Sequence, residues 1–485
     1  MDITAILYFY YMSFGCKVAI GYADKSAMKD KRQGMKQPTR QELLSSTPTK
    51  RAVLILALPT VISQLINVIY NLADIFFVGQ IGDPNKVAAV SLVLPAFMIT
   101  TALGNLFGIG GSSAVARAMG KGDMALARKH TTFCFYGAIV SAGLYSLLLL
   151  LFAKPFLRVY GASSATLPYA AQYAFWVLTV GAVPTVGNVV FAHLLRADGK
   201  PRVASLGLSM GGILNVILDP LFILLLRLEV VGVAVATLLS NTVVFVFFLV
   251  YWAKNRDTLT ITLHPKNLSL SKDVSRPVLA SGIPAAVQTF VVSLFFMFIN
   301  RQARAYSDLH VAGIGIVQKL DMIPQNVTLG LAQGTIPLIG YSYAAKNYKR
   351  MEDVSRFSLL IAVSFSLLYV LACELFAHTF VTWFIPDSPE TIAIGTRFTR
   401  IMCVCTPFMA ICNVMNAAFQ ATGKSKQALS VCLFRKVYFG LPMLYLLDWL
   451  FPETGLLLVM TVVDAIASVY VFYLSRRFKQ GLDVV

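Results

Sequence analysis

The stretch LPTVISQLINVIYNLADIFFVG (Leu58–Gly79) is apolar enough to lie inside a bilayer, yet it contains an aspartate. A transmembrane helix needs about 20 mostly apolar residues, and this stretch meets that requirement. A carboxylate at bilayer depth costs roughly 3 kcal/mol, so Asp74 should face protein or a water-filled cavity. At helical spacing, Leu, Ile and Phe cover most of the surface and the polar residues share one stripe: Ser63, Asn67, Tyr70, Asn71 and Asp74. The stripe is consistent with a structural polar seam between helices or with a cation or proton site.

The composition excludes a soluble globular domain and a disordered chain. Of 485 residues, 57% are hydrophobic and 13% are charged, and the mean hydropathy is +0.70. The net charge of +18 would suggest a nucleic-acid partner in a soluble protein, but here the basic residues lie mostly between apolar runs. The seven cysteines form no CxxC pair, so neither a disulfide framework nor a zinc site is indicated.

The chain divides into apolar segments of the length that crosses a membrane. We expect an all-α integral membrane protein with twelve transmembrane helices. The segments are 52–79, 87–115, 131–153, 169–195, 203–226, 231–252, 278–299, 311–341, 358–384, 398–421, 427–450 and 455–474.

Basic residues are distributed unevenly between the two sides of this arrangement. With the N-terminus inside, the cytoplasmic segments hold 30 of the 41 Lys and Arg residues and the outer segments hold 8. Since cytoplasmic loops carry the excess of Lys and Arg, both termini are expected in the cytoplasm.

An internal repeat divides the twelve segments into two halves. Three pairs of similar features are separated by 224 or 225 residues, which indicates a duplicated six-helix unit. Six is an even number, so both halves enter the membrane in the same orientation and a pseudo-two-fold axis along the membrane normal relates them. The pairs are RAMGKGDMALARK (Arg117–Lys129) with YSYAAKNYKRMED (Tyr341–Asp353), LLRADGKPR (Leu194–Arg202) with FQATGKSKQ (Phe419–Gln427), and Pro59 with Pro284.

The repeat gives a domain plan. We expect an N-terminal cytoplasmic extension at 1–50, an N-lobe with helices 1–6 at 51–252, a cytoplasmic linker at 253–277, a C-lobe with helices 7–12 at 278–475, and a cytoplasmic tail at 476–485. Met35 begins a plausible shorter chain that leads directly into the first span. The first 34 residues are therefore interpreted as an upstream extension outside the native start.

The sequence resembles the multidrug and toxic compound extrusion (MATE) transporters, and among them the bacterial branch. The resemblance covers about residues 45–475 and implies a twelve-helix, two-lobe fold and antiport of organic compounds against Na⁺ or H⁺. It is carried by LPTVISQLINVIYNLADIFFVGQIG, GGSSAVARAMGKGD, FAHLLRADGKPR, GGILNVILDPLFI and IPLIGYSYAAKNYKR.

The fifth segment offers partners for Asp74. In GGILNVILDPLFI, Asn215 and Asp219 are four residues apart and share a helix face, and Pro220 favours a local break. Oxygen atoms hold hard cations, and Thr237 in the sixth segment can add a hydroxyl. The residues alone also allow Asn215 and Asp219 simply to hydrogen-bond a kinked helix. The resemblance implies a cation or proton site at Asp74, Asn215, Asp219 and Thr237, with Na⁺ as the one metal ion considered.

The second half does not copy this site. The repeat counterparts of Asp74, Asn215 and Asp219 are not carboxylates, so we expect the coupling chemistry in the N-lobe. The eighth segment has its own stripe of Gln318, Asp321, Gln325 and Thr328. Asp321 is interpreted either as an ion-pair partner of a basic residue or as part of substrate binding or lobe closure. The basic residues considered for the pair are Lys319, Arg435 and Lys436.

Other polar residues in the apolar segments receive less specific predictions. We expect Asp448, near an outer end, to be solvated, and His193 to be a packed residue rather than a ligand. The candidates for the substrate cavity are Gln64, Asn67, Asn71, Gln318, Asp321 and Gln325.

The sequence predicts a secondary active efflux transporter that exports organic, cationic or amphiphilic compounds in exchange for Na⁺ or H⁺ by alternating access. A lipid-linked precursor flippase is the alternative, but it should have a strongly cationic cavity. No GxxxxGK[ST], HExxH or GxSxG pattern occurs, which argues against an ATP-driven pump and an enzyme. We expect a monomer in the inner or plasma membrane, surrounded by lipid, with a small-molecule substrate, no nucleic-acid partner and no cofactor besides the coupling ion.

Overall fold

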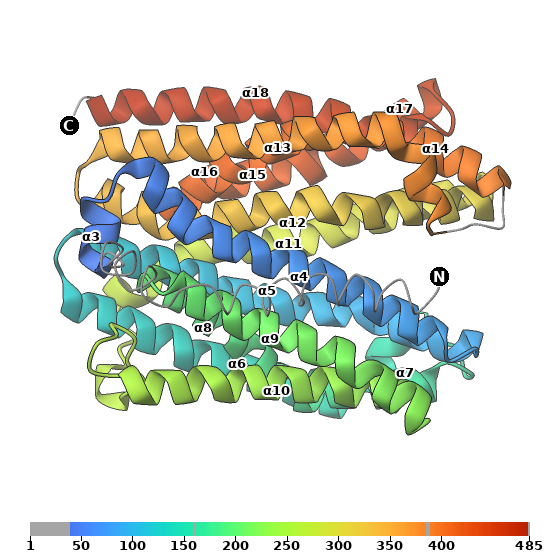
Figure 1. Ribbon diagram of the computed structural model, residues 1–485, viewed down its shortest axis with the longest axis horizontal. Helices are drawn as coiled ribbons and strands as arrows, with labels where there is room; N and C mark the ends of the chain where they lie inside the picture. The colour runs from blue at the N-terminus through green and yellow to red at the C-terminus, as the bar shows by residue number, and fades with distance from the viewer. Residues whose placement is uncertain (1–38, 160, 385–388, 484–485) are drawn as a thin grey trace, which may run out of the picture.

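The computed structural model describes residues 39–159, 161–384 and 389–483, and these ranges contain helices and no strand. Figure 1 shows the helices lying along one long axis. The first lobe consists of α4 (Thr49–Gly79), α5 (Pro84–Gly120), α6 (Met124–Val159), α7 (Leu167–Ala174), the π-helix η1 (Phe175–Val180), α8 (Ala182–Ala197), α9 (Pro201–Pro220), the π-helix η2 (Leu221–Leu225) and α10 (Glu229–Asn255).

The second lobe follows a linker that contains the 3₁₀ turn η3 (Pro265–Asn267). In Figure 1 its helices occupy the upper half of the view, with α13 and α18 at the top, whereas α10 lies at the bottom. It consists of α11 (Lys272–Arg304), α12 (Asp308–Ala344), α13 (Tyr348–Thr382), α14 (Pro389–Cys403), α15 (Thr406–Ala421), α16 (Ser425–Leu433), the π-helix η4 (Phe434–Tyr438), α17 (Gly440–Leu450) and α18 (Gly455–Asp483).

Each of the twelve expected segments coincides with a helix or with a run of consecutive helices, so the predicted all-α membrane fold is confirmed. Nine single spans and two bent pairs are long and apolar enough to cross a membrane, which gives up to eleven among the described residues. The expected segment that is not among these spans, 311–341, corresponds to α12, whose 37 residues include the polar stripe with Asp321.

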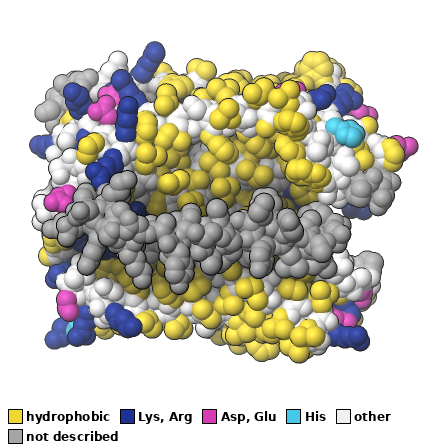
Figure 2. Space-filling view, viewed as in Figure 1, with side chains coloured by type: hydrophobic (Ala, Val, Ile, Leu, Met, Phe, Trp, Pro, Cys, Tyr) yellow, Lys and Arg dark blue, Asp and Glu magenta, His cyan; other side chains and the backbone are white. Residues whose placement is uncertain are grey.

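The outer surface has the distribution of side chains that a bilayer requires. Figure 2 shows hydrophobic side chains over the middle of the molecule and charged side chains gathered toward its two ends. Large apolar residues of α6 such as Leu148 and Leu151 are 56% and 63% exposed. Exposure of that kind is stable in hydrocarbon, where no water is available to disfavour it.

Two spans are bent, and they occupy equivalent places in the repeat. The direction changes by 47° between Leu167–Val180 and Ala182–Ala197, and by 45° between Pro389–Cys403 and Thr406–Ala421. These are the fourth span of each half. The shared bend supports the duplication that the sequence indicates.

The lobes meet through a reciprocal pairing of helices. Helix α5 packs on α11, and α4 packs on α12, so the first two spans of one half contact the first two of the other in crossed order. The approach is close because glycines face backbone: a Cβ on Gly282 would lie 1.9 Å from the Leu106 carbonyl oxygen, and one on Gly334 would lie 2.7 Å from the Ala57 Cα. Such crossed pairing is what a two-fold relation between the lobes produces.

The contacts between the lobes run from mid-span to the end where α5 finishes and α11 starts. Gln64 donates to Gln333 at 3.3 Å and Asn105 donates to Thr289 at 3.0 Å, both at mid-span. At the end itself, Arg117 of α5 donates to Ser113, to Ser281 and to the carbonyl oxygens of Pro277, Gln420 and Ala421. We call this the closed end, and Figure 1 shows the two lobes diverging away from it.

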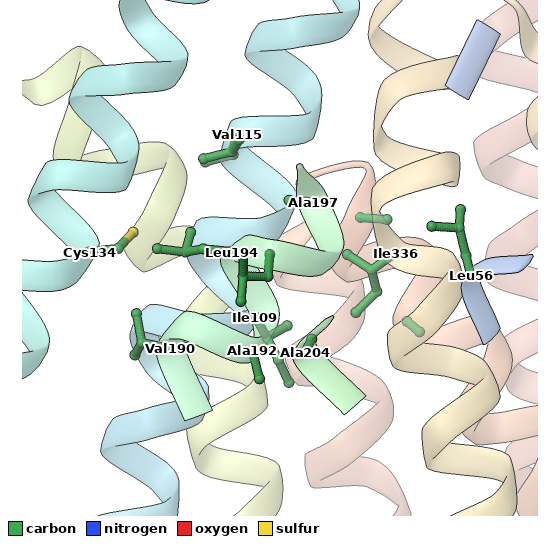
Figure 3. Close-up of a cluster of buried hydrophobic side chains, with 14 of the residues drawn as sticks. Leu56, Ile109, Val115, Cys134, Val190, Ala192, Leu194, Ala197, Ala204 and Ile336 are labelled. Carbon is green, nitrogen blue, oxygen red and sulfur yellow. The ribbon is translucent and has the colours of Figure 1, made fainter. Parts of the chain in front are cut away.

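A continuous hydrophobic core lies near the closed end. Figure 3 shows that α4, α5, α6, α8, α9 and α12 all contribute to it, so it includes helices of both lobes. The Cys134 side chain lies among these apolar groups. The six cysteines at 134, 373, 403, 405, 412 and 432 are all buried and free, whereas Cys16 lies outside the described residues.

A short helix before the first span connects both lobes at the closed end. In α3 (Arg40–Ser45), Arg40 pairs with Asp198 at 2.5 Å, and Arg350 of α13 donates to the carbonyl oxygens of Leu43, Leu44 and Thr47. Burial raises the pKa of Asp198, although the neighbouring Arg40 opposes this effect. The expected extension at 1–50 therefore ends in a packed helix, while its first 34 residues lie outside the described residues.

The linker between the lobes is bound to the first lobe. The carbonyl oxygens of Ile261, Thr262 and Leu263 accept hydrogen bonds from Trp252, Thr132 and Tyr136 at 2.9–3.0 Å. Leu259 and Ile261 are buried. The linker is thus part of the N-lobe surface rather than a free loop.

Candidate functional site

The first lobe brings together the polar residues of the fifth and sixth spans. Asn215 and Asp219 lie on one face of α9 and are 2% and 0% exposed. The Asn215 amide donates to the Asp219 carboxylate at 3.4 Å and to the Thr237 hydroxyl of α10 at 3.5 Å. These three residues of the sequence-predicted site are therefore neighbours.

Asp74 approaches this group from α4. Its carboxylate is close enough to Asp219 for the two charges to interact, and both act on the hydroxyls of Tyr70 and Tyr173. Tyr70 belongs to the predicted polar stripe, but Tyr173 of α7 was not predicted. A tyrosine in an apolar segment has no sequence feature that distinguishes it from a packed aromatic residue.

Three oxygen atoms of this group are buried without a hydrogen-bond donor. They are Asp74 Oδ1, Asn215 Oδ1 and Asp219 Oδ2. An unpaired buried acceptor costs about 1–3 kcal/mol, and more when it is charged. Two carboxylates and an amide suit either a hard cation or a shared proton, so the geometry is compatible with both forms of the predicted site.

The backbone changes shape directly after Asp219. Helix α9 ends at Pro220, and the π-helix η2 follows at once. Pro220 has no N–H and its ring crowds the preceding turn, so wider π-type bonding accommodates it better than an α-helix does. The predicted break at Pro220 is thus a local widening of a continuing helix.

A central cavity of about 560 Å³ lies between the lobes. Both lobes line it, and Asn215 and Thr237 form part of its wall, so the N-lobe oxygen group adjoins the cavity. Of the six substrate-cavity candidates, five line it: Gln64, Asn67, Asn71, Asp321 and Gln325. The sixth, Gln318, instead donates to Asn300 of α11 at 3.1 Å.

The second lobe places a charged cluster on the cavity wall. Arg435 donates to both oxygens of Asp464 at 2.5 Å and to Asn413 at 3.3 Å. Lys436 lies 4.0 Å from Asp464 and 4.8 Å from the centre of the Phe295 ring. The ion pair that the sequence suggested for Asp321 is therefore made by Asp464 with Arg435.

Asp321 belongs to the same cluster but makes no direct ion pair with another described residue. Its carboxylate is 6% exposed, interacts electrostatically with Lys436 and Arg435, and leaves Oδ1 without a hydrogen-bond partner. Lys319, the third basic residue considered, lies over the Phe384 ring at 5.8 Å. Asp321 therefore has an oxygen available for a group inside the cavity.

The closed end of the cavity contains two residues that the sequence did not assign to it. Arg196 and His193 of α8 line the cavity and are 1% and 3% exposed. The fourth expected segment ends at residue 195, so Arg196 was placed outside the membrane span. No sequence signal separates a basic residue in the last turn of a helix from one in the adjoining loop.

The solvent exposure of Asp448 differs from the prediction. It was expected to be solvated, but it is 6% exposed and accepts hydrogen bonds from Gln302 and Tyr306, both at 2.7 Å. Position along the chain places Asp448 near the end of a span. Only the packing of α11 against the end of α17 shows that two donors enclose it.

Known proteins of similar sequence and structure agree with this architecture. The MatE family model matches residues 59–221 and again residues 284–446, an offset of 225 residues that confirms the internal repeat. The multidrug export protein MepA of Staphylococcus haemolyticus is 28% identical over 438 residues, which is 90% of this chain and 95% of that protein. MepA of Staphylococcus aureus is 28% identical over 433 residues, 89% of this chain and 95% of that protein.

Solved structures resemble the fold as a whole. An outward-facing multidrug resistance MATE transporter of the MOP superfamily has a TM-score of 0.87 at 26% identity, with 93% of this chain and all of that chain covered. A MOP superfamily transporter from Pyrococcus furiosus has a TM-score of 0.86 at 25% identity, with 93% and 99% covered. Because the family model matches both halves in register with the repeat, the chain belongs to the MatE family, that of the MATE transporters.

Proposed function

We propose that this chain is a secondary active efflux transporter that exports organic compounds in exchange for Na⁺ or H⁺. The family membership and the multidrug export function of the MepA relatives support export of several compounds rather than one. The observation that carries the exchange is the group of three unpaired buried oxygens at Asp74, Asn215 and Asp219 beside the cavity wall.

The geometry suggests how ion and substrate can compete. Asp74 on α4 and Asp219 on α9 carry like charges in a poorly solvated site, so a cation or a proton between them relieves their repulsion. Binding draws these carboxylates together and thereby changes how α4 packs against α9. Because Asn215 and Thr237 belong to both the oxygen group and the cavity wall, this change reaches the substrate directly.

The cavity offers a counter-charge for a cationic substrate in the second lobe. Asp321 presents an oxygen without a partner, and the amides of Gln64, Gln325 and Asn67 line the same cavity. A cationic amphiphile can place its charge at Asp321 and its rings against Phe97 or Phe296. This arrangement supports cationic or amphiphilic organic substrates.

The charge of the cavity bears on the flippase alternative. The cavity wall includes the cations Arg196, Arg435 and Lys436 and the acids Asp321 and Asp464. Arg435 is neutralised by Asp464, so the wall is not the strongly cationic surface that a pyrophosphate head group needs. Export of organic compounds is therefore the better supported proposal.

The placement in the cell follows from the same argument. The relatives are transporters of bacterial cells, and we propose a monomer in the cell membrane with both termini in the cytoplasm. In that orientation the closed end faces the cytoplasm. The structure then corresponds to a state from which substrate leaves outward.

The test is substrate efflux from vesicles that contain the purified chain, with Na⁺ and pH gradients imposed separately. Asp74→Asn and Asp219→Asn should each reduce gradient-driven efflux to background, because each removes one of the two charges that bind the ion. Asp257→Asn is the matched control, because that carboxylate is exposed on the linker. Gradient-driven transport at the wild-type rate by both variants would refute the proposed site.

A further inference from the structure

Arg196 is a buried cation without a partner in the part of the chain that the structure describes. No hydrogen bond or ion pair to any described residue engages its guanidinium, and its Nε is buried without an acceptor. The other two buried Lys and Arg side chains among the described residues lie near an anion: Arg435 donates to the carboxylate of Asp464, and Lys436 lies 4.0 Å from the same carboxylate. An unpaired charge in such surroundings is costly, so Arg196 is expected to meet an anion.

The surroundings of Arg196 show where that anion lies. Arg196 lines the closed end of the cavity, next to the last residue of α8, and the nearest acid along the chain, Asp198, is already bound to Arg40. Gln420, the penultimate residue of α15, lines the cavity as well and carries an amide. The open side of the guanidinium is therefore the cavity itself.

His193 adds a second polar group one helical turn earlier. It is close enough to Arg196 to interact with its charge, and its Nδ1 is buried without a partner. Gly108 of α5 makes room for the ring, because a Cβ there would lie 2.8 Å from His193 Cδ2. Residues three apart on a helix share a face, so His193 and Arg196 can contact one ligand group.

We propose that His193 and Arg196 form an anion subsite for the carboxylate of zwitterionic organic substrates. This inference rests on the proposed export function and specifies its substrate class. Arg196 binds the carboxylate through the planar geometry that favours bidentate hydrogen bonds. The positive part of the same substrate then lies toward the unpaired oxygen of Asp321 on the other lobe.

A pair of dyes that differ only at the carboxylate tests the subsite. Rhodamine 110 carries a free carboxylate, and rhodamine 123 is its methyl ester. Arg196→Gln should raise the Kd of rhodamine 110 by about 30-fold, the effect of removing one partner of a buried charge pair. The Kd of rhodamine 123 should change far less, and Arg196→Lys should give an intermediate loss for rhodamine 110, because it keeps the charge and loses the planar fork.

The measurement is fluorescence polarisation with the full chain in detergent. Arg202→Gln is the matched control, because it removes the same charge from an exposed position six residues later. Without ligand, Arg196→Gln should melt at or above the wild-type temperature, since it removes a buried unpaired charge. A lower melting temperature would assign Arg196 a structural partner instead.

Several results would overturn the inference. These are equal loss of both dyes in Arg196→Gln, failure of the wild type to bind rhodamine 110, and displacement of rhodamine 110 by inorganic phosphate as readily as by benzoate. Failure of gradient-driven rhodamine 123 efflux would instead speak against the proposed export function. The comparison of acid with ester in the binding assay does not depend on that transport.

Discussion

Asp464 neutralises the basic residues of the second lobe. It is 1% exposed, it accepts two hydrogen bonds from Arg435, and its Oδ1 lies 4.0 Å from Lys436. The carboxylate thus compensates two cations that would otherwise share a low-dielectric wall. Breaking such a pair leaves an uncompensated buried charge, which is costlier than never having had the pair.

Asp464→Asn should therefore destabilise the protein by about 3 kcal/mol. The cost comes from Arg435, which keeps its charge and loses its counter-ion. Replacing both residues together, as Arg435→Met with Asp464→Leu, should recover part of the loss, because the Arg435 charge is then removed while Lys436 still lacks its counter-ion. Thermal unfolding of the purified variants in detergent measures both effects. Equal destabilisation by the single and double variants would show that the ion pair itself is not the source.

The residues of the candidate site also show how much of it the sequence predicts. Asn215 and Asp219 could be placed together because four residues along one helix determine their spacing. Tyr173 and Arg196 could not, since each reaches its site through packing between helices that are distant in sequence. The sequence identifies Asp321 as a polar residue in the membrane. Its neighbours could not be predicted, because they depend on which turn of η4 faces α12.

At the scale of elements, the contact of α5 with α11 depends on Gly282. The Leu106 carbonyl oxygen occupies the position where a side chain would begin, at 1.9 Å from a Cβ. Backbone atoms cannot move aside as a flexible side chain can. Any residue larger than glycine at position 282 must therefore push the two helices apart. The two lobes therefore touch most closely at a point that admits only glycine.

Gly282→Ala should destabilise the chain by about 1–3 kcal/mol, the usual cost of overpacking a core. Gly143→Ala on α6 is the control, because a Cβ there meets nothing within 4 Å. That control should be neutral or stabilising by up to about 1 kcal/mol, since alanine favours a helix more than glycine does. Melting temperatures of the two purified variants give the comparison, and an unchanged value for Gly282→Ala would contradict the close contact.

The helices themselves were largely predictable, but their irregularities were not. Apolar length locates all twelve segments, because a bilayer imposes about 20 residues on each span. Irregular turns and bends arise where a span must fit its neighbours, and hydropathy does not depend on that fit. They are the π-helices η1, η2 and η4 and the bends of 47° and 45°. Of the prolines near these places, Pro220 was predicted to break its span, and it gave no indication of the widened turn that follows.

At the scale of the whole molecule, Arg117 binds the two lobes at the closed end. It sits on α5 and donates to α11 and to the last carbonyl groups of α15. The proposed export by alternating access requires this end to open, and these bonds must then break together. Their loss should shift the population toward the state that is open at this end.

Arg117→Gln tests this role through the accessibility of the cavity floor. Gln420, which is 4% exposed, is replaced by cysteine in both backgrounds, and a hydrophilic maleimide is applied from the closed side. Labelling of that peptide, read by mass spectrometry, should be several-fold faster with Arg117→Gln than with Arg117 present. Equal rates would mean that the lobes stay together without the arginine. The peptide with Cys432, which is buried on α16, provides the internal reference for global unfolding.

The two attachments of helix α3 offer a way to observe movements of the lobes. It is held by Arg40 to the first lobe and by Arg350 to the second, so relative rotation of the lobes must strain or release one of these attachments. Ser46, at the end of α3, is exposed to solvent and lies outside the spans. A fluorophore attached there would sense each turnover without occupying the transport path, and single molecules could be counted cycle by cycle.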